Sequence, residues 1–139
     1  MRAVLDVNVL IALLLAPDGA SAQLMLRWLG GAFELITSDK LVAELRRALS
    51  YRKLLKRVAA AEAVLFVDLI EAVATRMPDP AESPRRSRDA GDDYLLALAS
   101  SSSAIVVTGD RDLLALREEF PIYSPSAFLA MLEDSRTRY

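Results

Sequence analysis

Four carboxylates lie at positions where an apolar segment ends, where a helix begins, or where a helix is expected to face inward. They are Asp6, Glu44, Asp93 and Asp110. Asp6 separates the apolar residues 3–5 from the apolar residues 9–15, and a charge buried between two such segments is costly unless it has a partner or a metal ion. The simpler interpretation is that Asp6 only caps the helix that follows it.

Glu44 lies three residues after Leu41 and four before Ala48, on the stripe that helical spacing directs toward the interior. Its carboxylate is therefore a candidate for the same buried site. The alternative is a glutamate at the boundary of the core that pairs with Arg47 or Lys40.

Asp92 and Asp93 open a segment that is otherwise almost wholly apolar. One of them is expected to cap the helix, because aspartate is favoured at that position and interacts well with the positive end of the helix dipole. Both cannot be the cap. We take Asp93 as the inward carboxylate and Asp92 as the cap or as an auxiliary ligand.

Asp110 and Asp112 flank Arg111 directly after the strand-like residues 104–108. Two acids at such a turn are commonly only a turn and a cap. Together with the other carboxylates they predict a shared pocket, because strand ends lie side by side in a sheet. Closely packed carboxylates raise one another's pKa unless a divalent cation neutralises them, and Mg²⁺ and Mn²⁺ prefer oxygen ligands.

The composition excludes several other chemistries. The 139 residues include no cysteine and no histidine, which rules out disulfides, thiolate zinc sites and histidine-dependent hydrolases. The formal net charge is -2, so any contact with nucleic acid must be local. The absence of cysteine fits a cytoplasmic location. No apolar run reaches the roughly 20 residues of a membrane span, so we expect neither a signal peptide nor an anchor.

The hydrophobic pattern predicts alternating strands and helices. The expected strands cover residues 3–5, 33–37, 104–108 and 121–123. The expected helices cover residues 9–15, 20–29, 39–49, 92–102 and a long tract over 51–76 in one or two pieces. Ser38 or Asp39 can cap the third helix, a short helix follows the turn at 109–112, and Ser124-Pro125 begins a last one. Residues 77–91, which hold three prolines, are expected to form a loop.

Apolar strands separated by helices predict an α/β fold, a three-layer sandwich with a central, mainly parallel sheet of four to five strands. The length suits one domain, which we expect to span residues 1–139. In such a sheet ligands bind at the carboxyl ends of the strands. Asp6 and Asp110 each follow a predicted strand.

Four segments occur in the order and spacing of a PIN domain. They are residues 4–11, 37–45, 88–99 and 107–114. On these segments essentially the whole chain resembles the PIN-domain family, in the branch of toxins related to VapC-type ribonucleases of toxin-antitoxin pairs.

The resemblance implies a metal-dependent endoribonuclease that uses Mg²⁺ or Mn²⁺ and acts as the toxin of a toxin-antitoxin pair. Its catalytic, metal-binding quartet would be Asp6, Glu44, Asp93 and Asp110, with Asp112 as an additional ligand. The auxiliary residues would be Asn8, Ser38, Asp92 and Thr108. The chain departs from the family at Val7, where a hydroxyl residue is usual, and at Ala90-Gly91, where relatives have Pro-Asp. Val7 removes a hydrogen bond behind the ligands, and such partners can affect metal affinity.

In the mechanism that this resemblance implies, one or two ions activate a water and orient the RNA phosphodiester, so no protein nucleophile is needed. The candidate contacts to RNA phosphates are Arg85, Arg86, Arg88 and Arg111. The alternative for these arginines is a solvated surface segment. The family also implies a small antitoxin partner and, often, a homodimer.

Three other functions are alternatives, and the order of the motifs disfavours the first two. A receiver-like phospho-acceptor domain needs a second acid near the first strand and a late lysine, where this chain has Asn8 and Arg111. A haloacid-dehalogenase-type phosphatase needs a second aspartate at the position of Asn8. A catalytically inactive PIN-like module that binds RNA or protein is kept open by Val7.

Overall fold

A computed structural model describes residues 1–15, 19–51, 53 and 56–137 of the chain. Its centre is a sheet of five strands in the order β3-β2-β1-β4-β5, with every neighbouring pair parallel. The strands are β1 (Arg2–Leu5), β2 (Glu34–Thr37), β3 (Thr75–Arg76), β4 (Ile105–Val107) and β5 (Ile122–Tyr123). The predicted α/β sandwich around a parallel sheet is therefore confirmed.

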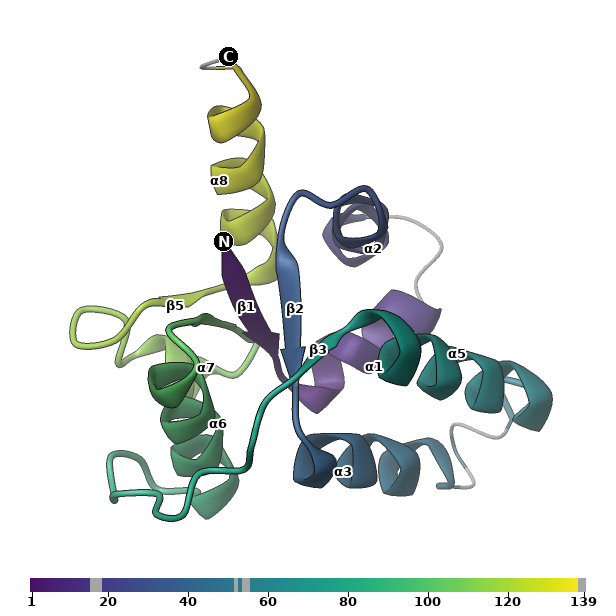
Figure 1. The fold of residues 1–139 in the computed structure, drawn as a ribbon, viewed down its shortest axis with the longest axis horizontal. Helices are drawn as coiled ribbons and strands as arrows, with labels where there is room; N and C mark the ends of the chain where they lie inside the picture. Colours follow the sequence, from purple (N-terminus) through teal and green to yellow (C-terminus); the bar gives the residue numbers. More distant parts are fainter. Residues whose placement is uncertain (16–18, 52, 54–55, 138–139) are drawn as a thin grey trace.

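Helices cover both faces of this sheet. They are α1 (Val7–Leu15), α2 (Ala20–Leu29), α3 (Asp39–Leu49), α5 (Ala60–Val73), α6 (Ala90–Ser101), α7 (Arg111–Leu114) and α8 (Pro125–Thr137). Figure 1 shows α6 and α7 on one side of the sheet and α1 and α5 on the other. The last helix begins as predicted, because the Ser124 hydroxyl accepts a hydrogen bond from the backbone N–H of Ala127 at 3.1 Å.

Alternation along the strands builds a core on each face of the sheet. Leu5 and Leu35 are buried in the cluster that also contains Phe128 of α8. Val4 and Ile36, their neighbours in sequence, belong instead to the cluster formed with α6 and α7. Successive side chains of a strand point to opposite faces, so apolar runs as short as these can fill two cores and make three layers.

The two central strands bring separated parts of the chain together. The chain passes from β1 to β2 and β3 on one side, and then to β4 and β5 on the other. β1 and β4 are paired with Leu5 opposite Val107. Ligands bind where the strand order reverses in this way, outside the carboxyl ends of the strands. Asp6 and Thr108 are the first residues beyond these two ends.

The helical tract predicted over residues 51–76 is only partly correct. Residues 52, 54 and 55 lie outside the described residues, α5 covers Ala60–Val73, and Thr75–Arg76 forms the edge strand β3. Thr75 pairs with Ile36 and donates a hydrogen bond from its hydroxyl to Glu34 at 2.5 Å. Pairing with a neighbouring strand outweighs local helix propensity here.

The loop predicted over residues 77–91 is slightly too long. α6 begins at Ala90, because the Asp89 carboxylate caps it by accepting a hydrogen bond from the backbone N–H of Gly91 at 2.7 Å. The predicted start of this helix at Asp92 was therefore wrong by two residues. Asp92 and Asp93 lie inside the first turn, and neither is the cap.

Candidate metal and catalytic site

Asp6 is held at the carboxyl end of β1 by two adjacent elements. It is 7% exposed. Its Oδ1 accepts a hydrogen bond from the backbone N–H of Val9 at 2.8 Å, and its Oδ2 accepts one from the hydroxyl of Thr108. Asp6 therefore caps α1, as one interpretation of the sequence held, and is also fixed to the end of β4.

Asp110 is tied to the same place through Thr108. The backbone N–H of Asp110 donates to the Thr108 hydroxyl oxygen at 3.0 Å. Asp110 also caps α7, since its Oδ1 accepts hydrogen bonds from the backbone N–H groups of Asp112 at 2.7 Å and Leu113 at 3.3 Å. A single threonine thus connects the two carboxylates predicted at the strand ends.

Asp92 is the carboxylate of α6 that is most strongly affected by these acids. Its pKa is raised from the ordinary 3.8 to about 6, first by burial and then by nearby negative charges. Those charges belong to Asp110, Asp89, Asp6 and Asp112. We call Asp6, Asp92 and Asp110 the acidic cluster.

Asp93, the next residue of α6, is hydrogen-bonded to the loop that precedes this helix. It is 3% exposed, and its Oδ1 accepts hydrogen bonds from the backbone N–H groups of Arg86 at 2.9 Å and Ser87 at 2.7 Å. The Ser87 hydroxyl adds a third at 3.0 Å. These bonds, the one from Arg86 first, lower the pKa of Asp93, and the charge of Arg85 acts in the same direction.

Glu44 lies beside a polar network. Its charge is not among the main influences on the pKa of Asp6 or Asp92. Its charge contributes to raising the pKa of Tyr94, after burial and the hydrogen bond with Asp79. The Tyr94 hydroxyl is hydrogen-bonded to Asp79 and to the hydroxyl of Ser38, and the Lys40 ammonium lies 4.1 Å from the centre of its ring. The structure thus assigns Glu44 to the region next to this network, on the half-buried face of α3.

The acidic cluster carries negative charge without a matching cation. Within the described residues, none of the ion pairs involves its three members. Burial, the largest influence, raises the pKa of Asp6, and the charge of Asp110 adds to it. No three acidic side chains of the described residues are arranged to hold an ion together. Mg²⁺ is usually bound through one or two carboxylates and keeps several waters, so an oxygen-only cluster of this kind fits such an ion.

Comparison with known proteins places this arrangement in a family. Residues 2–112, which contain every member of the acidic cluster, match the PIN domain. The chain belongs to the PIN domain family. PIN domains are generally nucleases. A curated relative of this PIN domain, the uncharacterized protein MJ1680 of Methanocaldococcus jannaschii, is 26% identical over 119 residues, which cover 86% of this chain and 77% of the relative.

Solved structures of low sequence identity share the fold of this PIN domain. PAE2754 from Pyrobaculum aerophilum has a TM-score of 0.66 and 21% identity, and the match covers 96% of this chain and 90% of that one. VapBC2 from Rickettsia felis, bound to a DNA fragment from its promoter, has a TM-score of 0.61 and 12% identity over 89% and 98% of the two chains. FitAcB from Neisseria gonorrhoeae has a TM-score of 0.55 and 19% identity over the same shares.

The other predicted site residues have separate places in the PIN domain. Ser38 caps α3, as predicted, by accepting a hydrogen bond from the backbone N–H of Leu41 at 3.2 Å. Asn8 is exposed, and its backbone N–H helps to lower the pKa of Asp6. The predicted RNA contacts are all exposed: Arg85, Arg86, Arg88 and Arg111.

Sequence reasoning missed the polar network, and one of its two alternatives for Asp92, cap or auxiliary ligand, is wrong. The predicted capping role of Asp92 is wrong, because Asp89 is the cap. Tyr94 could have been found, since a buried tyrosine hydroxyl usually requires a hydrogen-bond partner. Asp79, in the proline-rich loop, carried no comparable signal.

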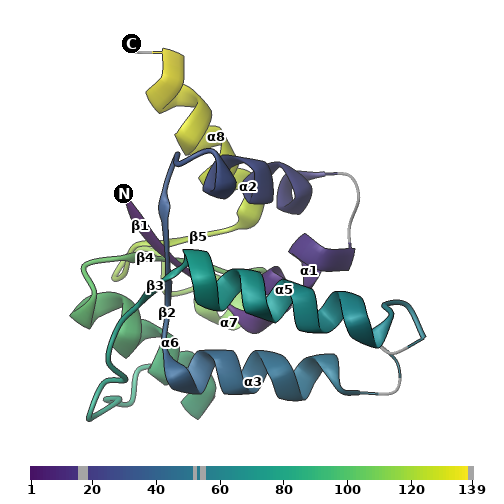
Figure 2. The same ribbon diagram turned by 45° about the vertical axis from the view of Figure 1, so that its right-hand side comes forward.

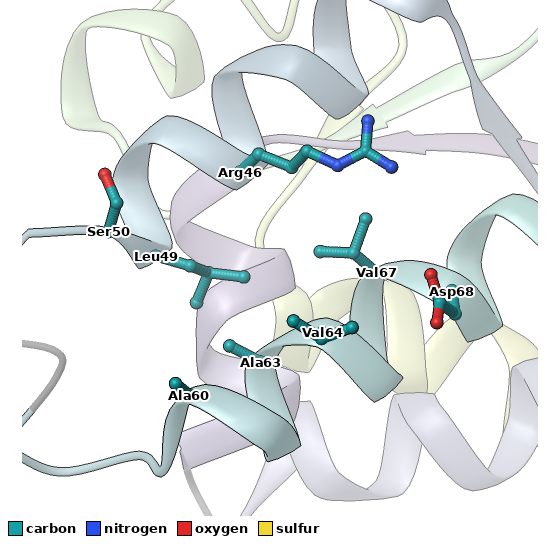
Figure 3. A pocket seen from close by; sticks show the side chains of 8 residues that line it. All are labelled: Arg46, Leu49, Ser50, Ala60, Ala63, Val64, Val67 and Asp68. Carbon is teal, nitrogen blue, oxygen red and sulfur yellow. The ribbon is translucent and has the colours of Figure 1, made fainter.

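An apolar groove lies between α3 and α5, which run side by side in Figure 2. Figure 3 shows Leu49 of α3 facing Val64 and Val67 of α5, with Arg46 and Asp68 as its charged lining residues. Val64 is 60% exposed. No member of the acidic cluster lines this groove, so it is a separate surface feature.

No single helix of the described residues is long and apolar enough to span a membrane. Together α1 and α2 have the length and composition of a span, but they are bent by 93° to each other.

The charge of Asp92 should make the metal-free protein sensitive to pH. Between 3.8 and about 6 the folded chain holds a proton on Asp92 that the unfolded chain has released. The folded state then binds more protons, so this group lowers the free energy of unfolding as pH rises through that interval. Urea denaturation in EDTA at about pH 4 and about pH 7 measures this effect. The free energy of unfolding of Asp92→Asn, relative to that of the wild type, should be higher at about pH 7 than at about pH 4. An equal difference at both pH values would contradict the charged environment of Asp92.

Proposed function

We propose that this PIN domain is a metal-dependent endoribonuclease whose active site is the acidic cluster. The observation that carries the proposal is the hydrogen-bonded link of Asp6 and Asp110 through Thr108 where the strand order reverses, within reach of the charge of Asp92. Carboxylates that are brought together without a cationic partner raise one another's pKa, as they do for Asp92. Such an arrangement destabilises the fold unless a cation binds, so its presence supports a functional role.

The ion would be Mg²⁺ or Mn²⁺, held by waters and by no more than two carboxylates of the acidic cluster, Asp92 among them. When bound, it would supply an activated water and neutralise charge that develops on a phosphodiester. Asp92 replaces the Asp93 of the original quartet, because Asp93 already accepts three hydrogen bonds from the loop before α6. Glu44, predicted as a member of the quartet, and Asp112, predicted as an additional ligand, stay in the proposal.

The residues of the chain itself prepare the site for this ion. Thr108 holds the Asp6 carboxylate and the backbone of Asp110 at one hydroxyl. The N–H of Val9 fixes the other oxygen of Asp6. The positions of two candidate ligands are therefore set before an ion arrives, which lowers the cost of ordering them on binding.

A ribonuclease assay tests the proposal. A fluorescently labelled single-stranded RNA should be cut by the protein in Mn²⁺ or Mg²⁺, and cleavage should stop in EDTA and return when the ion is restored. Binding of the RNA without cleavage in any of these ions would favour the inactive binding module instead. Cleavage that persists in EDTA would contradict a metal-dependent mechanism.

We also propose a protein partner of the antitoxin type, acting with the PIN domain in the cytoplasm. The proposal is supported by the shared fold with chains from VapBC2 and FitAcB. The groove between α3 and α5 offers an apolar strip with one basic and one acidic side chain, Arg46 and Asp68. It fits an amphipathic helix that carries complementary charges.

The purified protein encoded beside this chain is the probe for that partner. It should bind the wild type in a pull-down and bind Val64→Asp at least about tenfold more weakly, because a charge enters the apolar strip. RNA cleavage by the free variant should match the wild type. Equal binding by both proteins would remove the groove from the interface, and self-association lost in Val64→Asp would indicate a homodimer there.

A further inference from the structure

The loop before α6 is held by a buried carboxylate. Asp93 is 3% exposed, and its Oδ1 accepts hydrogen bonds from two consecutive backbone N–H groups and one hydroxyl, at 2.9, 2.7 and 3.0 Å. Burial of a carboxylate is costly unless its hydrogen bonds compensate for lost water. Bonds to an ionised acceptor are stronger than neutral ones. Asp93 therefore holds this segment in place through its hydrogen bonds.

The segment that Asp93 fixes is rich in exposed positive charge. Residues 85–88, which we call the arginine loop, contain Arg85, Arg86 and Arg88, all of them exposed. Arg86 also lines a hollow together with Pro84, Leu96 and Phe120. The hydrogen bonds to Asp93 hold the backbone N–H groups of two residues of the arginine loop, Arg86 and Ser87.

The arginine loop is also coupled to the acidic cluster. The Ser87 hydroxyl lies 2.8 Å from the carbonyl oxygen of Asp89, and the backbone N–H of Asp89 lies 3.3 Å from that hydroxyl. Asp89 caps α6, and its charge acts on Asp92 three residues later. Hydrogen bonds therefore connect the arginine loop to the cap of α6, and the charge of that cap acts on the proposed ligand.

We propose that Asp93 is a positioning residue, which holds the arginine loop so that its guanidinium groups contact the RNA backbone next to the acidic cluster. The proposal rests on the proposed ribonuclease function and assigns a different task to each of two adjacent aspartates. Asp92 serves the ion, and Asp93 serves the substrate. Arginine is suited to this task because its planar group matches phosphate oxygens.

Limited proteolysis tests whether Asp93 holds the arginine loop, and it needs no RNA. Trypsin cuts after arginine, so cleavage at Arg85, Arg86 and Arg88 reports how often the loop opens. Asp93→Ala should be cut there about tenfold faster than the wild type, because three hydrogen bonds to a charge are lost. Asp93→Asn keeps an acceptor oxygen without the charge, so it should be cut more slowly than Asp93→Ala and somewhat faster than the wild type. Asp68→Ala, on the surface of α5, is the matched control.

Binding of a labelled single-stranded RNA in EDTA tests the second part of the proposal, the contact between the arginine loop and RNA. A variant with Arg85, Arg86 and Arg88 changed to alanine should bind more weakly, with a slope of log affinity against log salt lower by about 2, at about 0.7 per lost contact. Asp93→Ala should move in the same direction, and Asp93→Asn should stay near the wild type. Mn²⁺ should stabilise both Asp93 variants as it stabilises the wild type.

The outcomes separate this inference from the ribonuclease proposal. Loss of Mn²⁺ stabilisation in Asp93→Asn would make Asp93 a ligand and overturn the inference. Equal trypsin cleavage of Asp93→Ala and the wild type would show that Asp93 does not hold the arginine loop. Unchanged RNA affinity in the triple variant would show that the arginines of this loop do not contact RNA. If Asp93→Ala fails to fold, Ser87→Ala, which removes the hydroxyl donor, should still speed cleavage of the loop. A wild type that never cuts RNA but shows all the expected differences would overturn only the ribonuclease proposal.

Discussion

Asp92→Asn is expected to reduce RNA cleavage by about 100-fold or more in Mn²⁺. Loss of residues that only support metal ligands costs about 10-fold to 100-fold, so loss of a direct ligand should reach at least the upper end of that range. The substitution keeps the size of the side chain and removes its charge. Initial rates on a labelled RNA, measured at several Mn²⁺ concentrations, would report the effect.

Asp93→Asn is the matched control for that experiment, because it makes the same chemical change at the next residue. It should keep most of the cleavage rate, since the amide oxygen can accept the hydrogen bonds from the arginine loop. The reverse result, with Asp93→Asn inactive and Asp92→Asn active, would support the quartet predicted from the sequence and contradict the site that we propose.

Phe128→Ala is expected to lower the free energy of unfolding by about 3–5 kcal/mol. Phe128 is fully buried in α8, and its ring meets Phe33 edge-on with 4.9 Å between the ring centres. The helix lies beyond residues 2–112 that match the family, yet it contributes to the same core as β1. Since stabilities of whole domains are about 5–15 kcal/mol, this loss should be plain in urea denaturation.

Leu26→Ala serves as the control for that measurement. Leu26 is 68% exposed on α2, and surface changes of this kind usually alter stability by about 0.5 kcal/mol or less. A loss from Phe128→Ala no greater than that from Leu26→Ala would mean that α8 is not part of the core.

The strands and their ends were predictable because each short apolar run is followed by a polar residue. Asp6 and Thr108 follow β1 and β4, and pairing of these strands brings the two residues into hydrogen-bond contact. The sequence could not reveal β3, because Thr75 becomes part of a strand only through the neighbouring backbone of β2.

The sequence could not predict the directions of the Asp92 and Asp93 carboxylates, and the reason is geometric. Neighbours on a helix point about 100° apart, so the direction of each depends on where the helix begins. The start was expected at Asp92, whereas Asp89 caps the helix at Ala90. The partners of Asp93 come from a loop whose path no local pattern specifies. Capping, loop path and the direction of both carboxylates are therefore settled together by the tertiary structure.

Thermal stability against Mn²⁺ concentration, for the wild type and Asp92→Asn, tests the central claim most directly, because it needs no knowledge of the RNA. At 100 times the dissociation constant, an ion that binds only the folded state adds about 2.7 kcal/mol, or roughly 8 °C for a chain of this size. The wild type should show this rise and Asp92→Asn should not. An equal rise in both proteins, or no rise in the wild type, would contradict a metal site built on the acidic cluster.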